Sequence, residues 1–284
     1  MTRDIRRSSS AAPPAADRCY GPPVATDQQQ LLADLRAEHA DLDALVDGVD
    51  PAAATPAAGW SVGDTVAHLW FFDREATTAL TDPDAFAAGL AEITANPEAW
   101  MARTLAEGRA LGPELSDVWR RTRADLLTAL AAADPATKVP WYGPPMSPAS
   151  FATARLMEYW AHGQDVADAA SVTRTPTARL RHICHLGVRT RGFSYAVRGL
   201  TPPDSAVFVG LRGPDGAAWC WGDEQATDRV EGSALDFCLV VTQRRHVDDT
   251  ALSITGPAAA EWMSIAQAFA GQPTLTDQNR AGLE

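Results

Sequence analysis

Apolar residues recur at helical intervals through the first half of the chain. Leucines spaced by four, seven and three residues follow Asp27, which is a suitable helix N-cap. Ser61 and Asp64 form a variant of the capping box, so a second helix begins in "GWSVGDTVAHLWFF". A third amphipathic pattern covers "ELSDVWRRTRADLLTALAAAD", and Ser147 caps a fourth helix after the proline-broken loop "VPWYGPPMS". These patterns predict a bundle of about four helices over residues 27–170.

The pattern changes towards the C-terminus, where strands and helices are mixed. One helix is predicted over residues 176–198, and it is followed by two strands in "SAVFVGLRGPDGAAWCWGD" that a Pro-Asp-Gly turn joins. Ser233 with Asp236 three residues on predicts the start of a further helix in "GSALDFCLVVTQRR". After a short strand in "TALSITG", a last helix is expected from Pro257 to Gly271. This mixture predicts a small α+β domain.

The predicted fold class is therefore α+β, with a helical bundle followed by a smaller α+β domain. Residues 1–26 are rich in Ser, Ala, Pro and Arg and show no hydrophobic period, so we expect a disordered segment. This segment also lacks the apolar stretch of a secretion signal. We expect the bundle to span residues 27–172 and the second domain to span residues 173–284.

The composition restricts the possible partners. A net charge of −12 over 284 residues argues against nucleic acid and anionic membranes, because both select basic surfaces. No apolar run reaches the roughly 18 residues that a membrane-spanning helix needs. The four cysteines are widely spaced and form no CxxC pair, so reduced thiols are expected. We therefore expect a cytoplasmic protein with a small-molecule substrate, as a monomer or a homodimer.

Three ionisable side chains share one side of the predicted helix in "ARLMEYWAHGQDVADAA". Glu158, His162 and Asp165 are spaced by four and three residues, so they lie within about 60° of one another around the helix. The helix is apolar nearly all round, which indicates burial, and a cation would satisfy buried carboxylates and imidazoles together. The alternative is the solvated face of an ordinary amphipathic helix, with Arg155 paired to Glu158.

A second histidine strengthens the case for a metal ion. His68 lies two turns into the helix that the capping box begins. It is either a hydrogen-bonded core histidine or a third ligand, because two histidines and a carboxylate on facing helices commonly hold a catalytic divalent metal. In the second case His68, Glu158 and His162 are the metal ligands. Asp165 would then accept a hydrogen bond from a ligand N–H or act as a general base.

Aromatic and cationic side chains are candidates for the pocket around this metal. Trp141 and Tyr142 lie on the proline-broken loop and suit a pocket wall that binds a cofactor or substrate. Arg244 and Arg245 could contribute to catalysis by clamping a substrate carboxylate. His246 follows them and would complement the dipole at the end of a helix.

Other cations have competing interpretations. His182 and His185 are three residues apart among arginines, which fits either a second metal site or a cationic helix face. Arg189 and Arg191, with the two arginines named above, belong to the second domain. Because pockets form preferentially where domains meet, we expect at least one of the four to face a cavity over the metal. Alternatively, all four point to solvent.

The motifs "GWSVGDTVAHL" and "ARLMEYWAHGQDVADA" resemble those of the DinB-like metal-binding helical bundles. More narrowly, they resemble the mycothiol-dependent maleylpyruvate isomerase group of actinobacterial proteins, and "VPWYGPPMS" is similar to an uncharacterised subgroup. The stretch "WMSIAQAFAGQP" resembles the α+β tail of these isomerases, which is itself similar to sterol-carrier-type folds. The resemblance implies a metal triad of His68, Glu158 and His162.

The resemblance also implies a reaction class. A divalent ion, zinc by preference, would bind a thiol such as mycothiol as the thiolate, which adds to a small electrophilic metabolite. The expected function is a thiol-dependent isomerase or S-transferase. Two alternatives remain: a thiol-independent lyase, cyclase or hydrolase that uses the ion as a Lewis acid, and a non-catalytic protein that binds a metal or an apolar ligand.

Overall fold

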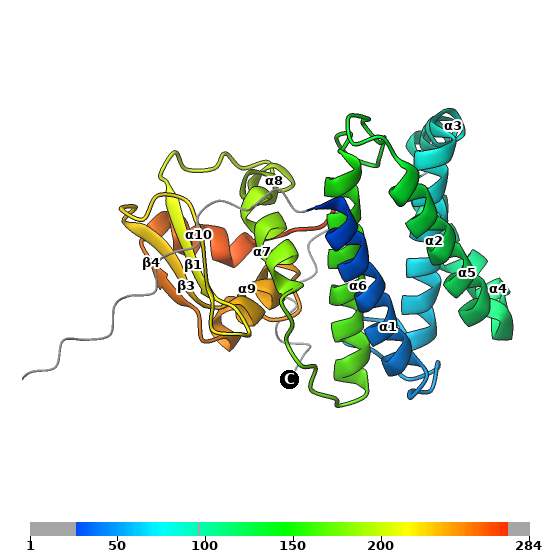
Figure 1. The fold of residues 1–284 in the computed structure, drawn as a ribbon, viewed down its shortest axis with the longest axis horizontal. Coiled ribbons are helices and arrows are strands. Elements are labelled where there is room, and N and C mark those ends of the chain that lie inside the picture. Colours follow the sequence, from blue (N-terminus) through cyan, green and yellow to red (C-terminus); the bar gives the residue numbers. More distant parts are fainter. Residues whose placement is uncertain (1–26, 96, 272–284) are drawn as a thin grey trace, which may run out of the picture.

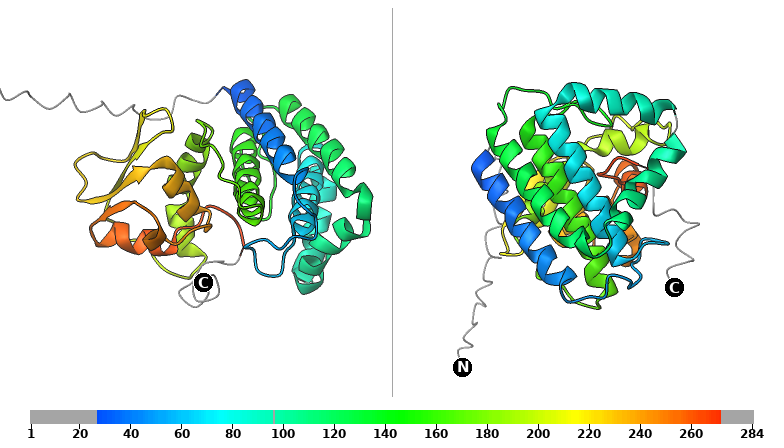
Figure 2. Two further views of the ribbon diagram at one scale, coloured as in Figure 1. Left: turned by 90° about the horizontal axis from the view of Figure 1, so that it is seen from below. Right: turned by 90° about the vertical axis from the view of Figure 1, so that its right-hand side faces the viewer.

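The computed structural model describes residues 27–95 and 97–271, which form ten α-helices and one four-stranded sheet (Figure 1). The disorder expected of residues 1–26 lies outside the described residues. Helices α1 to α6 form a bundle, and the sheet with α7 to α10 forms a second part beside it (Figures 1 and 2). Helix α7 packs against both α6 and α9, and so joins the two parts. None of the described helices is long and apolar enough to cross a membrane.

The bundle helices begin where the capping patterns predict. The Asp27 side chain accepts a hydrogen bond from the backbone N–H of Gln29. Ser61 and Asp64 form a reciprocal capping box, and Ser147 caps the helix that opens with a proline. The bundle consists of α1 (Gln28–Val46), α2 (Val62–Thr81), α3 (Pro83–Ala95), α4 (Pro97–Ala110), α5 (Leu115–Ala132) and α6 (Pro148–Ala169).

Helices α3 and α4 are absent from the sequence prediction. Pro83 and Pro97 stand at their first positions, where the missing proline N–H costs no intrahelical hydrogen bond. Helix α4 approaches α2 closely, because a Cβ on Gly108 would lie only 2.3 Å from the Cβ of Ala67. The two extra helices thus pack on the outer side of α2 and extend the bundle beyond its four central helices.

A charged pair is buried at the centre of the bundle. Arg155 of α6 donates to Oδ1 of Asp73 on α2 through Nη2 at 2.7 Å and Nε at 3.2 Å. Tyr159 donates to the same carboxylate and accepts a hydrogen bond from Trp119 Nε1 at 2.9 Å. Arg155 is therefore not paired with Glu158 as the alternative interpretation of this helix required, because the buried carboxylate of Asp73 takes this cation.

The second part is built on a mixed sheet with strand order β2-β1-β3-β4. The predicted hairpin is antiparallel, with Val209 opposite Trp221, whereas β1 and β3 run parallel. Strand β3 is not predicted from the sequence, because "DRVEGS" is largely polar. The elements are α7 (Leu180–Arg189), α8 (Arg191–Ala196), β1 (Val207–Arg212), β2 (Ala218–Trp221), β3 (Asp228–Ser233), α9 (Ala234–Val241), β4 (Ser253–Thr255) and α10 (Pro257–Ile265).

The single helix expected over residues 176–198 is two helices. The break lies at Thr190, whose hydroxyl donates to the carbonyl oxygens of Leu186 and Gly187. Side-chain hydrogen bonds of this kind compete with the regular backbone ladder.

The last helix is also shorter than expected, because it ends at Ile265 rather than Gly271. Beyond it, the backbone N–H of Ala268 donates to the carbonyl of Val241 at 2.8 Å. The carbonyl of Ala266 accepts a hydrogen bond from a side chain near the end of α9. Tertiary hydrogen bonds therefore replace the helical ones, and this segment runs back towards the bundle.

A buried carboxylate ties the connection between the two parts to α1. Glu38 is fully buried and pairs with Arg174 and Arg179, whose Nε lies 2.8 Å from Glu38 Oε2. Arg174 also donates to the carbonyl of Trp160 on α6 at 2.7 Å. These bonds hold the segment after α6 against the bundle.

The cysteines differ in part from expectation. Cys184 on α7 and Cys238 on α9 are free and buried, with sulfur atoms 3.5 Å apart. Burial raises the pKa of the Cys238 thiol well above its usual value. Cys220 on β2 is disulfide-bonded, so the expectation of free thiols is wrong for this residue.

The buried pair of Arg155 and Asp73 should contribute strongly to the stability of the bundle. Arg155→Met leaves Asp73 buried without its cation and should lower the free energy of unfolding by about 3–5 kcal/mol. Arg229→Met removes a partly exposed pair with Glu231 on the sheet and should cost about 1 kcal/mol. Urea unfolding followed by circular dichroism measures both. Equal losses in the two variants would contradict the assigned role of Arg155.

Candidate metal centre

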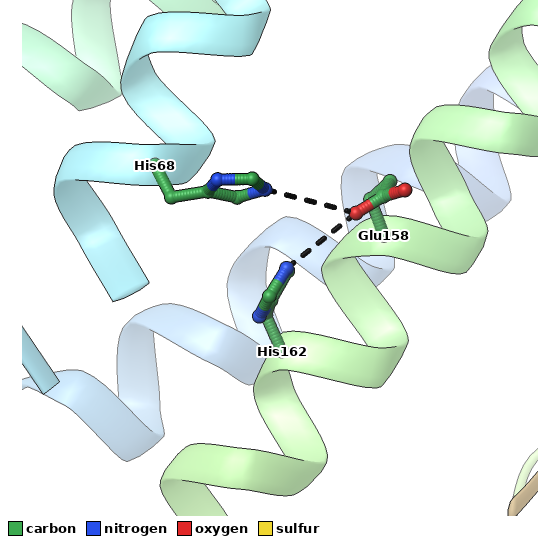
Figure 3. A group of neighbouring side chains, drawn as sticks. All are labelled: His68, Glu158 and His162. Carbon is green, nitrogen blue, oxygen red and sulfur yellow. Dashed lines mark ion pairs between the residues drawn. The ribbon is translucent and has the colours of Figure 1, made fainter. Parts of the chain in front are cut away.

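The three predicted metal ligands come together between α2 and α6. His68 lies on α2, and Glu158 and His162 lie one turn apart on α6, with their side chains directed towards one another (Figure 3). Oε2 of Glu158 is 3.9 Å from Nε2 of His68 and 3.5 Å from Nε2 of His162. The facing helices thus bring together residues that are ninety positions apart in the chain.

This donor set suits a divalent metal ion. Ligand bonds of about 2.0–2.2 Å in a tetrahedral arrangement separate neighbouring ligand atoms by about 3.3 Å. The separations of 3.5 and 3.9 Å are close to this value. Within the part of the chain that the structure describes, no fourth His, Cys, Asp or Glu joins the group. An ion bound here would therefore keep open coordination positions, as catalytic sites do.

The protonation states also suit a metal. Burial lowers the pKa of His68 to about 4, although the Glu158 carboxylate opposes this. Burial alone would raise the pKa of Glu158, but the two histidines outweigh it and hold that pKa well below its usual value. At neutral pH both groups are in the deprotonated form that a metal requires. Burial disfavours the cationic form of His162, yet bonds to Asp165 and Glu158 raise its pKa.

Asp165 connects the triad to the second part. Oδ2 of Asp165 lies 3.2 Å from Nδ1 of His162. Arg244 donates to Oδ1 through Nε at 3.1 Å and to Oδ2 through Nη2 at 2.7 Å. Burial would raise the pKa of Asp165, but Arg244 and His162 lower it to about 2. Such a carboxylate is a weak base at neutral pH. The geometry therefore favours orientation of His162 over general-base chemistry.

Trp60 is a further neighbour of the triad, and the sequence pattern did not assign it to the pocket. Its ring is stacked on His162 with centroids 5.9 Å apart and is tilted against His68 at 5.0 Å. The residue directly precedes the capping box of α2. The capping box was the available signal in the sequence, because it fixes how the chain enters α2 and therefore where the residue just before it lies.

The triad opens into a cavity of about 2300 Å³ that both parts of the chain line. Arg189, Arg244 and Arg245 line this cavity, as expected of at least one arginine. Arg245 pairs with Asp168 at 2.8 Å and 2.9 Å. Arg191 instead donates to backbone carbonyl oxygens of its own part.

The predicted loop aromatics also line the cavity. Trp141 stacks on Phe86 of α3 with ring centroids 5.6 Å apart. Tyr142 donates to Oε2 of Glu75 at 3.2 Å. Burial raises the pKa of Tyr142, and the nearby carboxylate adds to this shift. Both residues are therefore held in place by α2 and α3.

The remaining histidines have partners of other kinds. Nε2 of His182 lies 2.8 Å from Asp34, whereas His185 accepts a hydrogen bond from Trp221 at 3.3 Å. The two do not converge, so the structure does not assemble a second metal site from them. His246 does not lie at the end of a helix as expected, because it accepts the N–H of Asp248 and caps the short 3-10 helix Val247–Asp249.

The geometry predicts about one equivalent of a divalent ion per chain. His68→Ala and His162→Ala should each lose it, because two protein ligands rarely retain such an ion. His182→Ala is the matched control and should keep full occupancy, since His182 is paired with Asp34. Elemental analysis of the purified proteins measures this. Full occupancy in both triad variants would rule out the site.

Asp165→Asn should keep the ion but weaken its binding by roughly 10- to 100-fold, which is typical when a group that orients a ligand is altered. Arg244→Gln should weaken it in the same direction, because Arg244 holds the Asp165 carboxylate. Competition with a chelator of known affinity measures both. An unchanged affinity in Asp165→Asn would show that the contact with His162 does not orient it.

The sequence and the fold match known proteins. Residues 35–167 match the family model described as the mycothiol maleylpyruvate isomerase N-terminal domain. Residues 203–254 match a model described as wyosine base formation. Two Mycobacterium tuberculosis proteins, Uncharacterized protein MT0041 (strain CDC 1551 / Oshkosh) and Uncharacterized protein Rv0036c (strain ATCC 25618 / H37Rv), are each 49% identical over 251 residues, which is 87% of this chain and 98% of theirs.

Two solved structures share the fold. The crystal structure of the mycothiol-dependent maleylpyruvate isomerase is 16% identical with a TM-score of 0.54, and a mutant of that enzyme is 15% identical with a TM-score of 0.55. Each alignment covers 80% of this chain and 93% of the other. The chain therefore belongs to the family of mycothiol-dependent maleylpyruvate isomerase-type proteins, and its helical bundle corresponds to their N-terminal domain.

Proposed function

We propose that the protein is a metal-dependent enzyme that adds the thiol of mycothiol to a small electrophile, as an isomerase or an S-transferase. The supporting observation is a three-residue ligand set that opens into a large cavity. A structural metal is normally enclosed by four protein ligands, so this arrangement supports catalysis over a non-catalytic role. The choice of thiol rests on the family, whose solved members are described as mycothiol-dependent.

In this proposal His68, Glu158 and His162 hold a divalent ion, for which zinc suits the nitrogen and oxygen donors. A divalent ion in this position would supply Lewis acidity and favour the thiolate form of a bound thiol near neutral pH. Neutral His68 and ionised Glu158 need no proton loss before they serve as ligands. His162 must be neutral as well, so its raised pKa makes ligand binding compete with protons there.

Side chains around the triad orient the histidine ligands and shield them from water. Asp165 fixes the ring of His162 through Nδ1, and Arg244 fixes Asp165 from the second part. Trp60 covers both histidine rings and limits access of water to them. Arg189 is exposed on the cavity wall and offers a cationic hydrogen-bond donor to a ligand at that end of the cavity.

Thiol binding can be tested without knowing the electrophile. Addition of mycothiol to the cobalt-substituted protein should produce a sulfur-to-metal charge-transfer band, because a thiol bound at an open position contributes its sulfur. Mycothiol disulfide should produce none, and His162→Ala should show no band with either form. An unchanged spectrum at millimolar mycothiol would favour the thiol-independent Lewis-acid reaction.

A further inference from the structure

The cavity is larger than a single small ligand requires. Its volume of about 2300 Å³ exceeds the roughly 300–1000 Å³ of most small-molecule sites. Helix α6 runs along it, and Glu158 lies near the middle of the lining stretch. Phe151 comes seven residues before Glu158 and Asp165 seven residues after it, so each is displaced by about 10 Å along the helix axis. The metal centre thus lies between two ends of the cavity that are separated along the axis of α6.

The two ends of the cavity have different chemistry. One end, here called the aromatic lobe, is lined by Phe72, Leu90, Trp100, Trp141, Tyr142 and Phe151. The other end, here called the polar lobe, is lined by the charged or polar side chains of Asp168, Arg189, Arg244, Arg245 and His246, together with Leu186, Phe193 and Phe269. The aromatic lobe comes from the bundle and its loop, whereas the polar lobe lies where the second part meets α6.

The rings of the aromatic lobe form a continuous wall that begins at the metal centre. Phe72 follows His68 by one helical turn, and their ring centroids are 4.7 Å apart. From Phe72 the wall continues to Tyr142 at 5.8 Å and to Trp100 at 6.0 Å. Trp100 and Tyr142 are themselves 5.1 Å apart. A ligand in this lobe would contact ring faces and edges along its whole length and reach the triad at one end.

The two lobes also differ in the charges that line them. Of the four arginines that line the cavity within the described residues, Arg155 belongs to the bundle, and it is buried in its pair with Asp73. Arg244 and Arg245 are paired with Asp165 and Asp168, which leaves Arg189 without a carboxylate partner among residues 27–95 and 97–271. An anionic group in the aromatic lobe would therefore lack a counter-charge, which is costly in a dry cavity.

We infer that the aromatic lobe binds the electrophile, and that this substrate is a neutral, ring-bearing or similarly bulky apolar molecule. The inference rests on the proposed function, because it places the reactive carbon beside the metal centre and leaves the polar lobe for the hydroxyl-rich thiol. A small dianion would not suit this lobe, since it would bury few apolar atoms and find no unpaired cation there.

Unreactive imides test the lobe without any thiol. N-phenylsuccinimide and N-methylsuccinimide differ only in the apolar group, and titration calorimetry on the full zinc-loaded chain compares them. The phenyl compound should bind roughly 10- to 100-fold more tightly, as burial of a phenyl ring predicts. Equal affinities would overturn the inference.

Variants locate the binding. Trp100→Leu and Trp141→Leu should each lower the affinity for the phenyl compound by about 2- to 10-fold. Neither substitution should change the affinity for the methyl compound. Trp221→Leu is the matched control, because this half-buried ring on β2 does not line the cavity. Arg189→Ala should also leave the phenyl compound unaffected, since the ligand is neutral. A loss in Trp221→Leu equal to that in the lobe variants would overturn the assignment.

Proximity to the metal centre gives an independent readout. The fluorine resonance of N-(4-fluorophenyl)succinimide should broaden on the cobalt-substituted protein and not on the zinc form. Binding without broadening would place the probe elsewhere and overturn the inference. A cobalt–mycothiol band without phenyl preference would reject the lobe assignment alone. Phenyl preference with broadening but no mycothiol band would reject the thiol reaction and support the lobe as an apolar site.

Discussion

Asp165 makes the contact on which the geometry of the cavity depends. It is buried, so its carboxylate requires partners, and it finds one on its own helix and one in the second part of the chain. The bond to His162 directs the other nitrogen of that ring towards Glu158. The bond to Arg244 ties the second part to α6 beside the triad. One side chain thus orients a metal ligand and closes one side of the cavity.

The same requirement recurs along α6 and α1. Arg155 is matched by Asp73 inside the bundle, and Glu38 is matched by two arginines that follow α6. Each pair joins elements that are distant in the sequence, and each would be costly to leave incomplete. Because these cations are engaged structurally, they are not available to a substrate. The charge left over at the cavity wall is concentrated at the polar lobe, which gives the two lobes their different chemistry.

Much of the bundle and the ligand triad could be predicted from local sequence. Capping boxes act within four residues, so Ser61 with Asp64 marks the start of α2 reliably. Helical spacing places Glu158 and His162 on one face, and His68 on a facing helix is the third candidate by its ligand chemistry, as the resemblance also implies. The partner of Arg155 could not be predicted in this way, since Asp73 is 82 residues away. Strand β3 was missed because its pairing with β1 and β4, rather than its own composition, stabilises it.

The sequence by itself determined the helix starts, the α+β class and the residues able to bind a metal, because caps, periodicity and ligand chemistry are local properties. Only the tertiary structure decided which charges are paired and which remain free at the cavity. It also decided that Trp60 covers the histidines and that Trp100, on a helix absent from the prediction, completes an aromatic wall. The physical reason is that burial and pairing depend on packing between distant segments, and no local pattern contains that information.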